Sequence, residues 1–143
     1  EIIMQVLGKN SEINLGNINA ERDFTFVSDT ANGIIRALFS KKAIGETINL
    51  GSGRSHKIKD IVKLVSSILG EKVTITSNKD RLRPFDVNKL VCDNRKAKKI
   101  LNWEPKITFD EGLKNTIDWI KENDVELRTP FRGWPKQYRK IRK

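Results

Sequence analysis

Apolar positions recur every three to four residues in several stretches of this chain, and short β-branched stretches separate them. This spacing predicts amphipathic helices. Gly8 and Gly70 favour helix ends, and Thr108 with Glu111 forms a capping box that predicts a helix start. Helices are therefore expected over 1–8, 28–40, 58–69 and 94–101, and a further helix is expected to begin after Thr108.

The segments between these helices carry aromatic and β-branched residues in alternation with polar ones, which is typical of strands. Strands are expected over 12–16, 23–27, 46–51 and 72–76. Because strands and helices alternate along the chain, the predicted fold class is α/β. The polar, proline-bearing segment 77–87 is expected to form an exposed loop.

Two of these elements, the 28–40 helix and the 46–51 strand, carry further expectations. Ser28 is the expected N-cap of the 28–40 helix. The 46–51 strand, "ETINLG", is predicted to be parallel and buried on both faces. Without neighbouring strands it would expose an edge, so we expect the chain to self-associate or to have a partner. Four apolar residues of the 28–40 helix are expected to face the core: Ile34, Ile35, Leu38 and Phe39.

Composition restricts the class of protein. The chain has 143 residues, of which 37% are hydrophobic and 32% charged, as is typical of one soluble globular domain. No apolar run approaches the roughly 18 residues that span a bilayer, so no membrane association is expected. The single cysteine, Cys92, allows no internal disulfide and favours a cytoplasmic location. We expect Cys92 to be a buried apolar residue rather than a nucleophile.

The net charge of +10 is concentrated at the C-terminal end. Residues 128–143 carry basic side chains and no acidic ones, with Trp134 and Tyr138 among them. This pattern is compatible with a solvated extension, and also with a surface that binds nucleic acid. The predicted division is therefore a globular region over 1–127 and a basic tail over 128–143.

Most catalytic motifs are absent from the sequence. Gly51-x-Gly53 is followed by His56 where a dinucleotide fingerprint has its third glycine. His56 is the single histidine, so neither a histidine metal cluster nor a Ser-His-Asp triad is expected. No catalytic residue is assigned.

Arginine side chains are more informative candidates for ligand binding than the motifs above are for catalysis. Arg22 opens a predicted strand, and Arg81 and Arg83 lie in the proline-bearing loop, with Asp86 three residues after Arg83. A guanidinium binds a diphosphate through two parallel hydrogen bonds, and a carboxylate accepts hydrogen bonds from ribose hydroxyls. From the residues alone, a surface cation is the favoured interpretation of each arginine, and a ligand contact is the alternative.

Several segments occur together in a fixed order. They include "RDFTFVSD" at 22–29, "GETINLGSG" at 45–53, Arg83-Pro84, and "LNWEP" at 101–105. Over about residues 1–125 the chain resembles the C-terminal half of the extended short-chain dehydrogenases. More narrowly, it resembles the NAD-dependent nucleotide-sugar epimerases and 4,6-dehydratases. The resemblance implies the last Rossmann strands and helices together with a small substrate-binding lobe.

The resemblance also implies residue roles. Arg22 is expected to contact the nucleotide, Arg83 the diphosphate and Asp86 the ribose. Segment 13–17 is expected to line the base pocket, with Leu15, Gly16 and Asn17 as its candidate residues. Three further residues, Asp29, Trp103 and Pro105, are expected to be structural: Asp29 as a hydrogen-bond acceptor and the other two as packing residues.

The expected function is that of the nucleotide-sugar-binding portion of such an enzyme, with a UDP-, GDP- or dTDP-linked sugar as the ligand. NAD(P) is expected in the full-length enzyme and not in this chain alone, because the Gly-rich motif and the Tyr-x-x-x-Lys pair are missing. The expected partner is an N-terminal half outside this chain, or a second copy. Segment 84–87 resembles GDP-mannose dehydratases and 22–26 resembles UDP-sugar dehydratases, so the base stays open. The alternatives are a basic nucleic-acid-binding module and a non-catalytic interaction domain.

Overall fold

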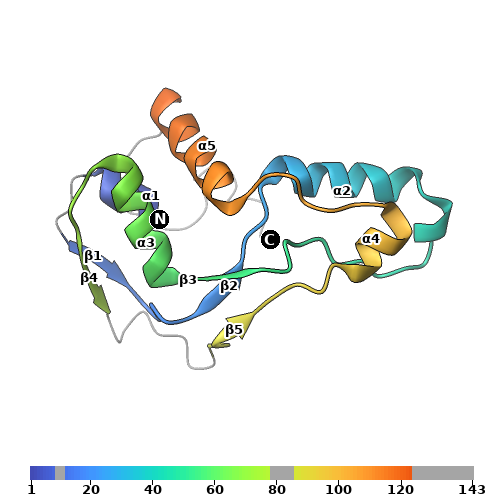
Figure 1. Cartoon of the computed structure of the whole chain (residues 1–143), viewed down its shortest axis with the longest axis horizontal. Helices are drawn as coiled ribbons and strands as arrows, with labels where there is room; N and C mark the ends of the chain where they lie inside the picture. The colour runs from blue at the N-terminus through green and yellow to red at the C-terminus, as the bar shows by residue number, and fades with distance from the viewer. Residues whose placement is uncertain (9–11, 78–85, 124–143) are drawn as a thin grey trace, which may run out of the picture.

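Helices and short strands alternate along the chain in the computed structural model (Figure 1). The structure describes residues 1–8, 12–77 and 86–123. This mixed architecture confirms the predicted α/β class. The elements are α1 (Ile2–Leu7), β1 (Glu12–Leu15), β2 (Glu21–Asp23), α2 (Val27–Phe39), the 3-10 helix η1 (Lys41–Ala43), β3 (Ser55–Lys57), α3 (Ile58–Leu69), β4 (Thr74–Ser77), β5 (Lys89–Leu90), α4 (Arg95–Leu101) and α5 (Phe109–Glu122).

The strands form two small sheets. In one, β1 pairs in parallel with β4, and Ile13 lies opposite Ile75. In the other, β2 is the central strand, antiparallel to β3 and parallel to β5. The second sheet places Arg22 opposite His56 on one side and Leu90 on the other, so three distant segments meet at β2.

The larger hydrophobic core lies where α1, α3 and α5 meet β1 (Figure 1). Ile13 and Leu15 of β1 and the apolar stripe of α3 supply most of it, as their periodicity predicts. Gly70 ends α3 in the left-handed conformation at φ 70°, and Thr108 caps α5 by accepting a hydrogen bond from the Glu111 N–H. The buried residues are Val6, Ile13, Leu15, Ile61, Val62, Val65 and Ile117.

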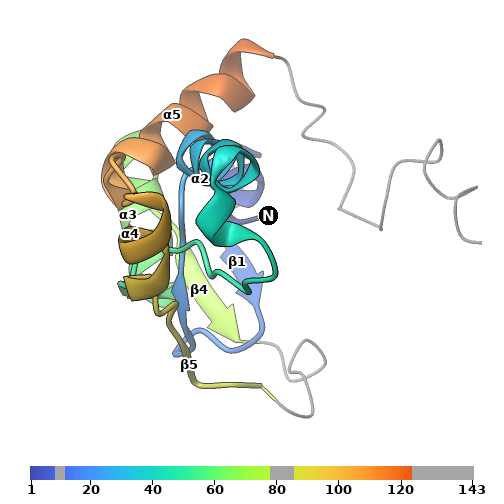
Figure 2. The same ribbon diagram turned by 90° about the vertical axis from the view of Figure 1, so that its right-hand side faces the viewer.

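A smaller core lies between α2 and α4, which pack next to each other (Figure 2). Its centre is Trp103, whose side chain is 1% exposed and whose Nε1–H donates to the Asp29 carbonyl oxygen at 2.9 Å. Ala97 and Leu101 of α4 complete the buried set. The prediction that Trp103 is a packing residue is confirmed.

Asp29 joins α2 to the segment that follows Trp103. Its carboxylate is buried and accepts hydrogen bonds from the backbone N–H groups of Lys106 at 3.0 Å and Ile107 at 2.9 Å. The expectation that Asp29 is a structural acceptor is therefore confirmed. Pro105, in the same segment, is half-buried.

The predicted strand 23–27 is wrong in its extent. β2 ends at Asp23, and α2 already begins at Val27, with Phe26 in the N-cap position and no side-chain cap. Ser28 is thus inside the helix. The reason is that β3 and β5 offer β2 only a few backbone partners, so nothing extends the ladder beyond Asp23.

The predicted strand 46–51 is also wrong. Among the described residues, the backbone groups of 47–50 form no hydrogen bond, so the segment has no ladder partner. Its burial is one-sided, since Ile48 and Leu50 are half-buried while Thr47 and Asn49 are exposed. A strand requires a neighbouring strand, and the described chain supplies none here.

Helix α2 departs from the prediction in its orientation. Ile34, Ile35, Leu38 and Phe39 do not face the core and are between 54% and 81% exposed. The buried side of α2 carries Asp29 and Gly33 instead. A Cβ atom at residue 33 would lie 2.7 Å from Leu50 Cδ1 and 3.1 Å from Trp103 Nε1, so only glycine permits this close contact.

Candidate functional site

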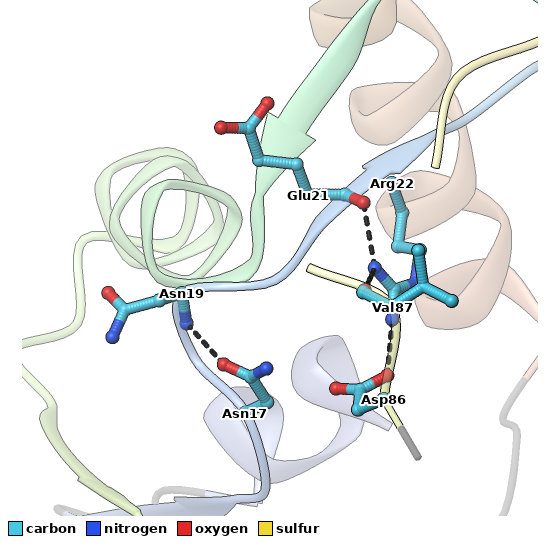
Figure 3. A network of polar contacts seen from close by, with 6 residues as sticks. All are labelled: Asn17, Asn19, Glu21, Arg22, Asp86 and Val87. Carbon is cyan, nitrogen blue, oxygen red and sulfur yellow. Dashed lines mark hydrogen bonds and ion pairs between the residues drawn. The ribbon is translucent and has the colours of Figure 1, made fainter. Parts of the chain in front are cut away.

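Arg22 is held in a fixed position at β2. Its Nη2 forms an ion pair with Asp86 Oδ1 at 2.6 Å, and its Nη1 donates to the carbonyl oxygens of Glu21 at 2.8 Å and Val87 at 2.6 Å (Figure 3). Both charged side chains are largely buried, with 25% of Arg22 and 18% of Asp86 exposed. A partly buried ion pair of this kind fixes the guanidinium plane more firmly than a surface pair does.

The Arg22 guanidinium keeps donors for a ligand. It has five N–H groups, and three of them form the hydrogen bonds to described residues. The Nε–H and one Nη2–H are not used by those bonds. Arg22 is thus oriented by acceptors of its own chain while it still has donors for an anion.

Arg22 lines a cavity with a volume of about 520 Å³. The walls come from β2, the 48–51 segment and the segment after β5, so residues far apart in sequence form one cleft. A cationic donor group within a cleft of this kind suits an anionic ligand. The lining residues are Arg22, Asp23, Thr25, Ile48, Asn49, Leu50, Gly51, Leu90, Val91, Cys92 and Asp93.

Asp23 holds the cleft walls together, although it was not predicted as a site residue. Its carboxylate accepts hydrogen bonds from Ser52 N at 3.0 Å, Ser52 Oγ at 2.5 Å, Gly53 N at 2.9 Å and Cys92 N at 3.1 Å. Partial burial raises the pKa of Asp23, but the bonds from Ser52, Cys92 and Gly53 outweigh it, and the pKa lies below its ordinary value of 3.8. The position of Asp23 at the end of a strand, next to Arg22, is the sequence signal that could have identified it as a site residue.

The 51–53 glycine turn does not fit the pyrophosphate of a dinucleotide. Its Ser52 and Gly53 N–H groups donate to the Asp23 carboxylate, so a phosphate would meet a negative charge rather than free donors. A Cβ atom at Gly51 would overlap Cys92 Cβ at 2.2 Å, so this glycine serves the packing of the cleft wall.

Cys92 is half-buried in the cleft wall rather than fully buried. Burial raises the pKa of its thiol, and the charges of Asp23 and Asp93 raise it further. The thiol is therefore protonated at neutral pH, which does not suit a nucleophile. Asp93, in contrast, has its pKa lowered to about 2 by its hydrogen bonds with Arg95.

The predicted base-pocket residues lie at the end of β1 and just after it. Leu15 is buried in the larger core, and its backbone lies opposite Ser77 of β4 in the ladder. The Gly16 carbonyl oxygen accepts from Ser77 Oγ at 3.0 Å, and Asn17 Oδ1 accepts from Asn19 N at 3.1 Å. Figure 3 shows Asn17 in the loop that leads into β2. The ligand roles of Leu15, Gly16 and Asn17 stay predictions.

Several predicted features lie outside the described residues. They are Arg81, Arg83, Pro84 and the basic tail 128–143. The proposed convergence of Arg22 and Arg83 on one diphosphate therefore stays a prediction. In the described part of the chain, no group of three or more His, Cys, Asp or Glu side chains is placed to hold a metal ion, and no helix is long and apolar enough to cross a membrane.

Comparison with known proteins gives the family. A family model for GDP-mannose 4,6 dehydratase matches residues 1–116. The chain belongs to this family. The family match includes β2, the 48–51 segment and the segment after β5, so it contains every wall of the Arg22 cleft.

Individual relatives differ in activity. A UDP-glucuronate 4-epimerase from Thermodesulfobacterium geofontis is 40% identical over 116 residues, which are 78% of this chain and 33% of that protein. UDP-glucuronic acid decarboxylase 1 from Danio rerio is 31% identical over 144 residues, which are 96% of this chain and 32% of that protein. The second match extends beyond residue 127, where the family model does not reach.

Solved structures agree with the fold. The UDP-glucuronic acid 4-epimerase from Bacillus cereus, in complex with UDP-glucuronic acid and NAD, has a TM-score of 0.76 and 31% sequence identity. The match covers 85% of this chain and 38% of that one. The chain thus spans about a third of the length of the relatives that it matches, over their C-terminal region.

Proposed function

We propose that this chain is the nucleotide-sugar-binding portion of an NAD-dependent sugar-nucleotide epimerase or 4,6-dehydratase. The observation that carries the proposal is Arg22, a guanidinium fixed by three hydrogen bonds inside a cleft of about 520 Å³ with donors left over. The family match and the UDP-glucuronic acid bound by the Bacillus cereus relative support the same ligand class.

In this proposal Arg22 donates its unused N–H groups to the diphosphate of the nucleotide. Arg83 contributes a second guanidinium to the same diphosphate, and the two cations together neutralise its charge. Asp86 accepts a hydrogen bond from a ribose hydroxyl while it keeps its ion pair with Arg22, because a carboxylate has about four acceptor positions. Leu15, Gly16 and Asn17 line the base pocket through backbone groups and the Asn17 amide.

NAD and the catalytic groups belong, in this proposal, to the part of the enzyme that this chain does not contain. The glycine turn at 51–53 has its amide donors engaged by Asp23, and the chain has no Tyr-x-x-x-Lys pair. When bound in the complete enzyme, NAD supplies hydride acceptance and return. The role of this chain is to bind the nucleotide diphosphate and orient the sugar.

Isothermal titration calorimetry of the 143-residue chain with UDP, GDP and dTDP tests the proposal. We expect at least one nucleoside diphosphate to bind and Arg22→Ala to weaken that binding by at least about tenfold, since a charge-assisted bidentate contact is lost. Arg22→Lys keeps the positive charge but loses the pair of parallel N–H donors, so it is expected to retain only part of the nucleotide affinity.

Lys63→Ala is the matched control, because it removes the same charge from an exposed position on α3 outside the cleft. It is expected to leave the dissociation constant within about twofold. Absence of binding by all three nucleotides to a chain whose circular dichroism shows a folded state would contradict the proposal. Equal weakening by Arg22→Ala and Lys63→Ala would contradict the assignment to the cleft.

A further inference from the structure

A second cavity, with a volume of about 260 Å³, is lined by residues of α2 and of the segment 102–106 that follows α4. Figure 1 shows this segment running alongside α2, and a hydrogen bond from Lys106 N to the Asp29 carboxylate joins the two. None of the residues that line this cavity lines the Arg22 cleft. It is therefore a separate site of the chain, which we call the Arg36 cavity after the α2 residue in its wall.

Arg36 is held in one orientation by acceptors of its own chain. Its Nε–H donates to Asn32 Oδ1 at 2.8 Å, and its Nη1 donates to the carbonyl oxygens of Asn102 at 2.9 Å and Leu101 at 3.3 Å. The two carbonyl bonds cap the C-terminal end of α4. Both N–H groups of Nη2 have no acceptor among the described residues. Capping α4 therefore accounts for Nη1 alone, and Nη2 retains two donors for a ligand.

Positive charges exceed negative charges around the Arg36 cavity. Arg36 and Lys106 both line it, and neither forms an ion pair with a carboxylate of the described residues. Glu104 is the one acidic residue of the lining, and its Oε1 already pairs with Lys98 Nζ at 2.7 Å. The nearby Asp29 carboxylate is buried and accepts hydrogen bonds from two backbone N–H groups. Two unpaired cations thus remain at the cavity, which suits an anionic ligand.

The donors and the volume of the cavity suit a phosphate monoester. Such a group carries a charge of about −1.5 to −2 at neutral pH, which matches two unpaired cations better than the single charge of a carboxylate does. Guanidinium and ammonium groups are the usual protein donors to phosphate oxygens. Asn32 adds amide N–H donors, because its amide oxygen faces Arg36 Nε. Trp103 and Pro105 also line the cavity and provide an apolar wall for the organic part of the ester.

We propose that the Arg36 cavity binds the phosphate group of a small phosphate monoester, of about the size of a sugar phosphate. Arg36 Nη2 and the Asn32 amide donate to the phosphate oxygens, and the Lys106 ammonium neutralises the second negative charge. The bound anion links α2 to the segment after α4, because its ligands come from both. The inference does not depend on the proposed function, since the Arg36 cavity shares no residue with the Arg22 cleft.

The test is a nuclear magnetic resonance titration of the 15N-labelled 143-residue chain with glucose 6-phosphate at constant ionic strength. We expect saturable shifts of the Arg36 Nε–H, the Trp103 indole N–H and the Lys106 backbone amide, with a dissociation constant on the order of 1 mM. Inorganic phosphate is expected to shift the same signals. Acetate is expected to bind at least about fivefold more weakly than glucose 6-phosphate, and uncharged glucose to cause no shift.

Lys106→Ala and Arg36→Lys are each expected to weaken the binding of glucose 6-phosphate at least about fivefold, because the first removes a cation and the second removes the Nη2 donors. Lys99→Ala is the matched control, since it removes an exposed lysine of α4 that does not line the cavity, and is expected to have less than about a twofold effect. Arg22→Ala, which tests the nucleotide site, is expected to leave these shifts unchanged.

Three outcomes would overturn the inference. One is no saturable shift of the Arg36 Nε–H with glucose 6-phosphate or inorganic phosphate. Another is equal weakening by Lys106→Ala and Lys99→Ala, which would show general attraction to basic side chains. The third is acetate that binds as tightly as glucose 6-phosphate. Lys106→Ala leaves every hydrogen bond of the Arg36 side chain in place, so it decides the matter even where Arg36→Lys fails to fold.

Discussion

The β1–β4 region, formed by α1, β1, α3, β4 and α5, buries its apolar residues in the usual way. The α2–α4 region, formed by α2, η1, the 46–51 segment, α4 and Trp103, does not. The two regions lie toward opposite ends of the long axis (Figure 1). The first has seven buried core residues from several elements, whereas the second has three, grouped around Trp103.

The comparison teaches that apolar patterning predicts a helix and its apolar face, but not whether the described chain covers that face. In the β1–β4 region the described chain supplies the contacts that cover such faces. In the α2–α4 region, contacts of Gly33, Asp29 and Trp103 hold α2 in place, and the apolar side of α2 is exposed.

Trp103→Ala is expected to have the largest effect, because it removes the centre of the α2–α4 core and the hydrogen bond to the Asp29 carbonyl oxygen. We expect a loss of about 4 kcal/mol in the free energy of unfolding by urea denaturation. Trp119→Ala, which truncates an exposed tryptophan, is expected to change stability by less than about 0.5 kcal/mol. Equal losses of unfolding free energy for the two variants would contradict the assignment of Trp103 as the centre of the α2–α4 core.

Replacing one isoleucine by alanine in each region sharpens the contrast between their packing. Ile13→Ala in β1 empties a fully buried site and is expected to cost about 3 kcal/mol. Ile34→Ala on α2 is expected to change the stability of the free chain by less than about 0.5 kcal/mol, since the side chain is 60% exposed. Chemical denaturation of both variants measures this, and a large loss for Ile34→Ala would show that the apolar side of α2 is already covered.

Asp23→Asn tests the hydrogen bonds that hold the walls of the Arg22 cleft together. An asparagine in the same orientation accepts fewer of the four hydrogen bonds, so we expect a loss of about 2 kcal/mol at pH 7. Because the folded-state pKa of Asp23 lies below the ordinary value of 3.8, its charged form stabilises the fold above that pH. This stabilisation is lost as the pH falls through the lowered pKa.

The difference in unfolding free energy between wild type and Asp23→Asn is therefore expected to be constant above about pH 5 and to shrink below about 3.8. Denaturation curves at a series of pH values measure it. A difference that stays constant down to pH 2 would show that the charge of Asp23 contributes nothing to the stability of the cleft walls.

Sequence patterns predicted the β1–β4 region well. The stripe of α3, the stop at Gly70 and the Thr108 cap are local signals, and the structure confirms each. The role of Asp29 and the burial of Trp103 were also predicted, although by resemblance to a family.

The errors concern features that depend on distant contacts. Ile34 and Leu38 were expected inside because their spacing specifies an apolar face without specifying its partner. The strand at 46–51 lacks its partner in the described chain, so no ladder forms. Asp23 was missed because its four donors come from Ser52, Gly53 and Cys92, which only the folded chain brings to it.

The central claim is that a nucleoside diphosphate binds in the Arg22 cleft, and nuclear magnetic resonance tests it most directly. In a titration of the 15N-labelled chain with the nucleotide that binds in calorimetry, we predict shifts of the Arg22 side-chain Nε–H and of the backbone amides of Asn17 and Cys92, with saturation. Shifts confined to residues 128–143, or no change at the Arg22 Nε–H when the nucleotide is saturating, would contradict the account.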